Sequence, residues 1–317
     1  MTWQDVLIES AEPDADLRPV LRRLFERAWE TWPLWRSGVE ALASVQVKEL
    51  HASDGGVRVQ TNLGRSRSVH AAVDPASVAA RPCFLCPHTF PAGECGVAWG
   101  DLALLPNPFP VLPGHLTIAS TRHEPQALSG RALDLVQLAQ GVGGETAVFY
   151  NGPRCGASAP DHFHFQACAA TLPVFELLPG EPPVRGHCAI ASFGRRFVAL
   201  FDDDAPRLAA RLEAAVAAWG RTQAMRDGEP MCNVLVRWQG GRGTALLFPR
   251  RAHRPAVFHA GGADHIAVSP AAIEMSGILV VTDALSFQRL DERAARAVFE
   301  EVSATPERFA AFLEQMQ

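Results

Sequence analysis

The sequence predicts an α+β fold built from two similar halves, and two observations indicate this class. Segments with strand alternation and segments with helical spacing occur in a similar order in both halves, although the halves share no strong identity. Of the 317 residues, 48% are hydrophobic, which is enough for a large core. The proline-rich stretch 177–186 is the expected seam between an N-terminal half, 1–176, and a C-terminal half, 187–317.

The N-terminal half is expected to begin with helices and to continue mostly in strands. Apolar residues recur at helical spacing over 14–35, Pro33 ends this pattern, and a short helix over 37–44 follows. Residues 44–62 alternate around Asp54-Gly55-Gly56, which predicts a β-hairpin. The remaining elements are a strand–turn–strand over 102–120, a helix over 126–142, and strands over 146–152 and 161–171.

The C-terminal half is expected to repeat this order. A strand or hairpin pair covers 187–203, and Asp204 can cap a helix over 205–226 with Pro206 in its first turn. Residues 231–250 form a hairpin that turns at Gly240-Gly241. A short helix and a strand over 265–283, a helix near 290–302 and a last helix over 306–316 complete the half.

Charge and cysteine content narrow the class of protein. The net charge of −5 and the pI of about 6.1 argue against a nucleic-acid partner. The N-terminal residues lack the pattern of a signal peptide, and no apolar run is long enough to span a membrane. We therefore expect a cytoplasmic protein whose seven cysteines are thiols or metal ligands.

Two histidines and a glutamine in "DHFHFQ" form the strongest candidate for chemistry. Side chains alternate along a strand, so His162, His164 and Gln166 share one face while Phe163 and Phe165 can pack into a core. A half-buried strand with merely hydrogen-bonded histidines is the structural alternative.

The turn before these histidines suits an anionic group. In "NGPRCGASAP", Gly152 and Gly156 allow a close backbone approach, Ser158 offers a hydroxyl and Asn151 an amide. Backbone amides and small side chains beside imidazoles are the groups that hold phosphate.

The segment "NGPRCGASAPDHFHFQ" resembles the active-site segment of the histidine-triad superfamily. It is most similar to the branch with galactose-1-phosphate uridylyltransferase and diadenosine tetraphosphate phosphorylase, in which the triplet ends in Gln. The stretches "VQTNLGRSRSVHAAVD" and "SPAAIEMSGILVV" resemble segments of the GDP-hexose phosphorylases. The whole run from "VQTNLGR" through "RPCFLC" to "NPFPVLPGHLTI" resembles an uncharacterised bacterial family of this kind. The third histidine of the GDP-hexose phosphorylases is Gln166 here.

The resemblance implies two histidine-triad-like halves, each an antiparallel sheet with packed helices. It also implies that His164 attacks the α-phosphorus of a nucleotide and forms a nucleotidyl-imidazole, with Gln166 on the transferred phosphate. The substrate would be a nucleoside diphosphate sugar or a dinucleoside polyphosphate, and phosphate or a sugar phosphate would be the acceptor. The alternatives are a hydrolase on the same nucleotides and a non-catalytic nucleotide-binding protein. In related proteins the active site often lies at an interface between subunits or between the two halves, which is compatible with a homodimer.

A metal site is expected in the same half. Cys83 and Cys86 have C-x2-C spacing, which lets two thiolates bind one tetrahedral ion, although two buried thiols are the alternative. The uridylyltransferases complete such a pair with a downstream His and the first His of the triplet, which correspond here to His123 and His162. Zinc is favoured, iron would accept the same ligands, and the role would be structural. His88 is a competing ligand.

Several other residues are candidates for the substrate site. Asn107 is a candidate for the ribose pocket, and Arg65 and Arg67 are candidates for holding phosphates, with solvated arginines as the alternative. His115 is expected to support the fold. Arg250, Arg251 and Arg254 form a basic cluster that either meets a phosphorylated second substrate or is a solvated loop.

Overall fold

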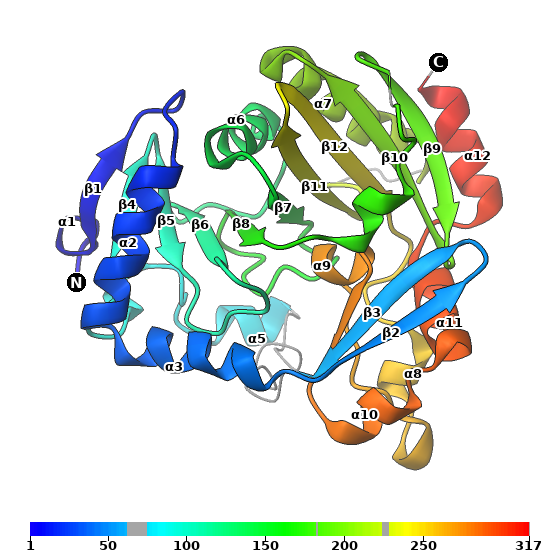
Figure 1. The fold of residues 1–317 in the computed structure, drawn as a ribbon, viewed down its shortest axis with the longest axis horizontal. Helices are drawn as coiled ribbons and strands as arrows, with labels where there is room; N and C mark the ends of the chain where they lie inside the picture. Colours follow the sequence, from blue (N-terminus) through cyan, green and yellow to red (C-terminus); the bar gives the residue numbers. More distant parts are fainter. Residues whose placement is uncertain (62–74, 182, 224–227, 317) are drawn as a thin grey trace.

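A ten-stranded sheet runs through the molecule and carries both halves of the chain (Figure 1). The computed structural model describes residues 1–61, 75–181, 183–223 and 228–316. The strand order is β1-β4-β5-β6-β8-β7-β11-β12-β10-β9, and only β1 and β4 pair in parallel. In this order the strands are Leu7–Ala11, Gly96–Trp99, Leu102–Pro106, Leu116–Ser120, His164–Ala169, Thr146–Asn151, Cys232–Gln239, Arg242–Pro249, Arg195–Asp202 and Gly186–Ser192.

The two halves have the same topology within this sheet. The N-terminal half contains, in chain order, β5, β6, helix α6 (Ala132–Val142), β7 and β8, and its strands lie in the sheet in the order β5-β6-β8-β7. The C-terminal half contains β9, β10, helix α7 (Ala205–Thr222), β11 and β12, and its strands lie in the equivalent order β9-β10-β12-β11. The equivalent strands β7 and β11 pair antiparallel, with Phe149 opposite Leu235. The halves are therefore joined edge to edge in one sheet and are related by an approximate two-fold arrangement.

A second sheet connects distant parts of the chain. It has three strands in the order β13-β3-β2, which are Ile278–Val281, Gly55–Thr61 and Val47–Ala52. The β2–β3 hairpin turns at Asp54, as predicted, but its other neighbour in the sheet, β13, comes from the C-terminal half. This sheet packs through one apolar cluster against the face of the large sheet that includes Phe149, Leu235 and Phe248.

The opposite face of the large sheet is covered by helices. Phe163 and Phe165 are buried there with α6, α7, helix α2 (Arg18–Thr31) and helix α12 (Pro306–Gln315), which confirms the predicted apolar side of the histidine motif. The other helices are α1 Trp3–Val6, α3 Pro33–Ala41, α5 Pro75–Ala79, α8 Ala256–His259, α9 Ala272–Met275, α10 Ala284–Arg289 and α11 Glu292–Val302, with short 3-10 turns at Leu42–Ser44, Pro87–Thr89, Pro173–Leu177 and Gly262–Asp264.

Most predicted elements are present, with shifts at their ends. Asp204 accepts the backbone N–H of Arg207 and caps α7, and the β11–β12 hairpin turns at Gly240-Gly241. Helix α6 begins at Ala132 and not at 126, and α3 begins at Pro33 and not at 37. The parallel pair β1–β4 was not predicted.

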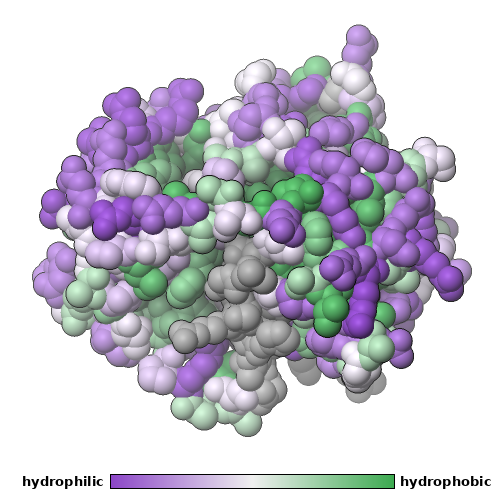
Figure 2. Space-filling model, turned by 60° about the horizontal axis from the view of Figure 1, so that its bottom comes forward, coloured by the Kyte–Doolittle hydropathy of each residue, from purple (hydrophilic) through white to green (hydrophobic). Residues whose placement is uncertain are grey.

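The surface is mixed in character. In Figure 2, hydrophilic side chains predominate on both flanks and apolar ones gather nearer the middle of the face. Among the described residues, no helix combines the length and the apolar composition that crossing a membrane requires.

Candidate active site

A cavity of about 530 Å³ opens on the face of the large sheet that α6 and α7 do not cover. Its floor comes from β8, β6 and β5, and its walls come from residues 81–94, from the loop after β5 and from residues 253–274 of the C-terminal half. The cavity brings together six of the predicted site residues: Asn107, Asn151, Gly156, Ser158, His164 and Gln166.

His164 presents an unprotonated ring nitrogen. Its Nδ1 lies 2.9 Å from the carbonyl oxygen of His162, and a carbonyl can only accept, so Nδ1 carries the proton and Nε2 keeps its lone pair. Burial lowers the pKa of His164 to about 4, which keeps the imidazole neutral. The backbone is fixed as well, because the side chain of Gln126 accepts the N–H of His164 and donates to its carbonyl.

Gln166 is oriented by a chain of hydrogen bonds through His115. The backbone N–H of Val111 donates to Nδ1 of His115 at 3.1 Å, so the proton of this ring is on Nε2. Nε2 of His115 then donates to Oε1 of Gln166 at 2.8 Å. The oxygen of the glutamine amide is thereby occupied, and its NH₂ group is the part left to donate to a ligand.

Asn151 is oriented in the same way from the other half of the molecule. Its Oδ1 accepts from the side chain of Asn233 at 2.9 Å and from the backbone N–H of Ala272 at 2.8 Å. Both carbonyl lone pairs are used, and within the described chain its NH₂ group donates to no acceptor. Two amide NH₂ groups beside His164 are therefore available for the oxygens of a phosphate.

The glycine turn forms another wall of the cavity. Gly156 has a φ of +101°, and a Cβ there would lie 2.5 Å from the Cβ of Ala271, so only glycine fits between the turn and the segment that leads into α9. The carbonyl of Ser158 accepts from Nη2 of Arg81 at 2.7 Å, which ties the turn to residues 81–94. In the part of the chain that is described, the backbone N–H of Ser158 donates to no acceptor.

The predicted metal ligands form one cluster at the edge of the site. One ligand atom from each of Cys83, Cys86, His123 and His162 lies within 4.8 Å of the others. Nδ1 of His162 lies 3.2 Å from the sulfur of Cys83 and 3.5 Å from that of Cys86, and Nδ1 of His123 lies 3.4 Å from the sulfur of Cys86. Tetrahedral coordination with metal–sulfur bonds of about 2.3 Å and metal–nitrogen bonds of about 2.0 Å separates such ligands by about 3.5 Å, so the geometry fits a tetrahedral ion.

The surroundings of His162 support this assignment. Its Nε2 donates to the carbonyl of Ser120 at 2.8 Å, which leaves the lone pair on Nδ1, the atom that faces both cysteine sulfurs. Burial raises the pKa of the Cys83 thiol to about 12, and a bound cation would reverse this by stabilising the thiolate. His88 lies in a short 3-10 turn and is not part of the cluster.

Other candidates are placed differently. Asn107 lines the cavity, but its side chain is used locally: it donates to Oγ1 of Thr117 and accepts the N–H of Phe109. Arg250 is fully buried and donates to backbone carbonyls, and Arg251 donates to those of Glu300 and Glu301, so of the basic cluster only Arg254 lines the cavity. Arg65 and Arg67 lie outside the described residues.

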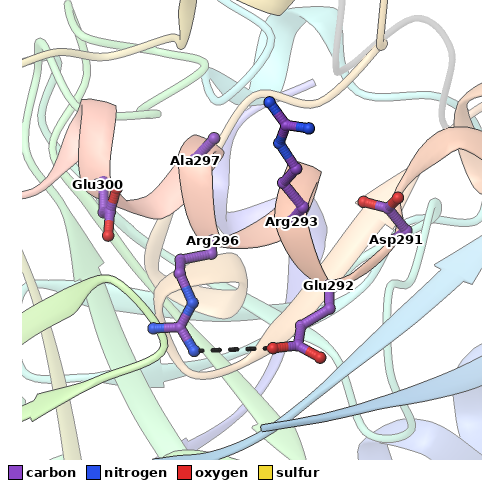
Figure 3. A pocket seen from close by; sticks show the side chains of 6 residues that line it. All are labelled: Asp291, Glu292, Arg293, Arg296, Ala297 and Glu300. Atoms are coloured by element: carbon purple, nitrogen blue, oxygen red, sulfur yellow. Dashed lines mark ion pairs between the residues drawn. The ribbon is translucent and has the colours of Figure 1, made fainter.

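A second depression is a weaker candidate. It is lined by residues of α11 and the residue before it, Asp291 to Glu300, and Arg296 faces Glu292 at 4.0 Å (Figure 3). Its lining comes from a single stretch of chain, and Arg296 also pairs with Asp54 at 2.7 Å. This depression is part of the charged surface and holds none of the predicted site residues.

Comparisons with known proteins agree with this arrangement. Residues 24–169 match a domain of unknown function, DUF4922, and residues 212–316 match the GDPGP1-like C-terminal domain. The fold is similar to that of yeast Ap4A phosphorylase Apa2, with a TM-score of 0.54, 17% identity and coverage of 86% of this chain and 98% of that chain. The Apa2 complex with Ap4A gives a TM-score of 0.53, 17% identity and coverage of 86% and 97%. No curated protein matches the sequence significantly.

The likeness to Apa2 extends over most of both chains and shows that the two proteins share a fold. The C-terminal domain match and the Apa2-like fold support the superfamily and branch that the sequence motifs resemble. Strand β8 carries His164 and Gln166, whereas the equivalent strand β12 carries no histidine.

Sequence reasoning missed residues that hold the motif in place. Gln126 and His115 act on His164 and Gln166 through hydrogen bonds, and Arg81 and Glu94 line the cavity. Gln126 has no motif of its own and was assigned to a helix. His115 is expected from the sequence to support the fold, but its ring tautomer depends on Val111 and becomes visible only in three dimensions.

Proposed function

We propose that this enzyme is a nucleotidyltransferase of the phosphorylase type that works through a nucleotidyl-His164 intermediate. Its substrate is a nucleoside diphosphate sugar or a dinucleoside polyphosphate. The observation that supports this is the reactive face of His164: a buried, neutral imidazole with a free Nε2, beside two amides whose oxygens are already occupied. Asn107, Asn151, Gly156 and Ser158 line the space for the nucleotide, and Arg65 and Arg67 are proposed phosphate ligands.

In the first step, Nε2 of His164 attacks the α-phosphorus. The N–P bond forms while the P–O bond to the leaving phosphate breaks, and the bonding electron pair departs with that oxygen. The imidazole becomes cationic, and its Nδ1–H remains bonded to the His162 carbonyl, which stabilises the charge. The NH₂ groups of Gln166 and Asn151 donate to the phosphorus oxygens, where negative charge is concentrated.

In the second step, an oxygen of phosphate or of a sugar phosphate attacks the same phosphorus. The new P–O bond forms, the N–P bond breaks, and the electron pair returns to Nε2, so His164 is again neutral. An anionic acceptor oxygen has no proton to lose, so this step needs no further base.

Zinc is the proposed ion of the Cys83, Cys86, His123 and His162 cluster, because two thiolates and two imidazoles are its usual tetrahedral set. The ion would keep the thiols deprotonated and would hold the start of β8 against residues 81–94. His162 would hold the ion through Nδ1, and its carbonyl accepts from His164, so the site would position the nucleophile without taking part in the transfer.

The test is trapping of the intermediate. The full chain is incubated with a panel of nucleoside diphosphate sugars and dinucleoside polyphosphates, and the adduct is located by peptide mass spectrometry. We expect a nucleotidyl group on His164, none in His164→Asn, and normal labelling in the control His187→Asn, whose side chain is exposed on β9. Discharge by phosphate, sugar phosphate or water then identifies the acceptor. Turnover that survives His164→Asn would contradict the proposal.

A further inference from the structure

A fully buried arginine lies behind the wall of the cavity that the C-terminal half supplies. Arg250 directly follows strand β12, is 0% exposed and is not among the residues that line the cavity. Its guanidinium donates to oxygens of the C-terminal half, which are the carbonyls of Ala252, His253, Pro270 and Val302 and Oδ1 of Asn233. A buried charge is costly unless such hydrogen bonds are made, so this cluster has one well-defined arrangement.

The donor-only character of Arg250 sets the direction of two amides in turn. Arginine has no acceptor, so the atom of Asn233 that faces it must be the oxygen Oδ1. The nitrogen Nδ2 of Asn233 then points the other way and donates to Oδ1 of Asn151 at 2.9 Å. Since Asn151 lines the cavity and its oxygen faces Asn233, a ligand in the cavity meets its NH₂ group. The direction of hydrogen bonding that begins at Arg250 therefore ends at the ligand.

The same asparagine holds the glycine turn. Nδ2 of Asn233 also donates to the carbonyl of Cys155 at 2.8 Å, and Cys155 directly precedes Gly156. Asn233 is fully buried and lies opposite Asn151 in the pairing of β11 with β7. Backbone pairing thus brings the two asparagines together, while Arg250 determines which end of each amide faces the other.

Arg250 acts on Asn151 by a second route, through the segment that leads into α9. Its Nη2 donates to the carbonyls of His253 at 3.1 Å and Pro270 at 3.0 Å, which joins the two ends of the C-terminal wall. Two residues after Pro270, the backbone N–H of Ala272 donates to Oδ1 of Asn151 at 2.8 Å. Both donors to this oxygen, Asn233 and Ala272, are therefore held in place through Arg250.

We infer that Arg250 is a positioning residue of the phosphate site, which directs the NH₂ group of Asn151 at the transferred phosphate and fixes the turn beside it. Hydrogen bonds in a chain polarise one another, and the charge at the start of this chain makes Asn151 a stronger donor to an anion. The half without the histidine motif thus controls phosphate donors of the other half. The inference deepens the proposed function and rests on it for the identity of the ligand.

The side-chain amide of Asn151 can be observed directly by selective ¹⁵N labelling of asparagine. The sequence has four asparagines, so the spectrum of the full chain contains few NH₂ signals, which substitutions assign to Asn62, Asn107, Asn151 and Asn233. Inorganic phosphate is titrated at constant ionic strength. The change in the Asn151 signal reports both the contact and the affinity, and neither depends on turnover.

The variants interrupt the chain of hydrogen bonds at two points. Arg250→Met removes the buried donor, and Asn233→Leu replaces the intermediate amide with an apolar side chain of similar size. The matched control is Arg251→Met, because Arg251 is the exposed neighbour and donates to the carbonyls of Glu300 and Glu301. It removes the same charge from the adjacent position without touching Asn233.

We expect phosphate to shift the Asn151 signal in the wild type and, with the same affinity, in Arg251→Met. Arg250→Met and Asn233→Leu should each weaken phosphate binding about tenfold, because each removes a hydrogen bond that orients Asn151. Adding Asn233→Leu to Arg250→Met should change the affinity by less than about twofold, since both act along one path. Asn233→Leu alone decides the matter if Arg250→Met does not fold.

Unchanged phosphate binding in Asn233→Leu, or no response of Asn151 in the wild type, would overturn the inference. Equal weakening in Arg250→Met and Arg251→Met would do so too, since it would show a general effect of charge, and additive losses would show that Arg250 does not act through Asn233. Failure of the transfer mechanism is distinguishable, because it abolishes labelling of His164 while the phosphate response of Asn151 and its dependence on Arg250 persist.

Discussion

The direction in which the Gln166 amide points depends on which nitrogen of His115 carries a proton. The Val111 N–H occupies Nδ1 of His115, so Nε2 must donate, and the glutamine oxygen must accept. His115 is buried and does not line the cavity, whereas Gln166, to which it donates, does. It is therefore a positioning residue, and its contribution should depend on the residue at position 166.

Replacing His115 with Phe should slow formation of the His164 adduct about tenfold, because the loss of one hydrogen bond of about 1 to 1.5 kcal/mol lets the amide rotate. Gln166→Ala should cost about a hundredfold, since it removes a donor to the transferred phosphate. Adding His115→Phe to Gln166→Ala should then change the rate by less than about twofold. Additive losses, measured by single-turnover labelling, would show that His115 acts independently of Gln166.

At this scale, local pattern predicts which side chains can meet but not how they are oriented. Strand alternation correctly separated Phe163 and Phe165 from His164 and Gln166. His162 lies before β8 begins, and its ring belongs to the thiol cluster and not to the cavity. The orientation of Gln166 and Asn151 depends on His115, Asn233 and Ala272, which are distant in sequence, so no local pattern could have shown it.

Among the elements, the proposed metal site would link the segment 81–94 to the start of β8. Cys83→Ser should reduce the bound metal, expected at about one ion per chain, to background and should lower the thermal unfolding temperature, because a structural site contributes folding free energy. The measurements are metal analysis and calorimetry of purified protein. Cys188→Ser, on the remote strand β9, is the matched control and should retain the metal. Equal metal content in the wild type and Cys83→Ser would contradict the site.

The β2–β3 hairpin is attached to α11 and to the β9–β10 turn by Asp54. Its carboxylate accepts from both Nη atoms of Arg296, at 3.0 and 2.7 Å, and from the N–H of Phe193, which has a φ of +51°. The hydrogen bonds from Arg296 lower the pKa of Asp54 to about 2. The folded state therefore prefers the ionised form, and the stabilisation is present above pH 4 and is lost as the pH falls towards 2.

Asp54→Asn should lower the free energy of unfolding by about 1 kcal/mol at pH 7, a modest value because the pair is partly solvated. The difference from the wild type should shrink as the pH falls from 4 towards 2. Urea unfolding at pH 7, 5 and 3 measures this, with the exposed Asp14→Asn as control. A difference that stays constant with pH would show that the ion pair is not its source.

Elements with strong local signals were predicted, and those that depend on distant partners were not. The β11–β12 hairpin and the cap of α7 are determined by residues that are adjacent in the sequence. Strand β4 has four residues and pairs in parallel with β1, so its register depends on a segment about 90 residues away. Helix α6 begins late because Gln126, assigned to the helix, instead bonds the backbone of Asn151 and His164.

For the whole molecule, the pairing of β7 with β11 joins the two halves of the chain at the centre of the large sheet. The cavity is lined from both halves of the chain, with Ala271 and Glu274 contributed by the C-terminal half. The repeated order of elements could be predicted from the sequence. The pairing of β7 with β11 could not be predicted, because Phe149 and Leu235 are distant in the sequence and no local pattern indicates that they lie opposite each other.

We expect one nucleotidyl group per chain at saturation, because β12 carries no counterpart of the histidine motif. Specific labelling, measured by intact mass spectrometry, should be independent of protein concentration across the range in which sedimentation reports the oligomeric state. Two adducts per chain, or labelling that requires association of chains, would contradict a site completed within one chain.

The missing chemistry of the C-terminal half has a consequence for how such a chain can evolve. Once a duplicated unit is fused to its twin, only one copy must conserve the residues that react. The connection between β7 and β8 contains the glycine turn and His162, whereas the equivalent connection between β11 and β12 consists of Gly240-Gly241 alone. The C-terminal half can then accept more substitutions. Those in residues 253–274 would change the lining of the cavity while His164 stays the same. Changes of substrate in relatives of this chain should therefore accumulate in the half that performs no catalysis.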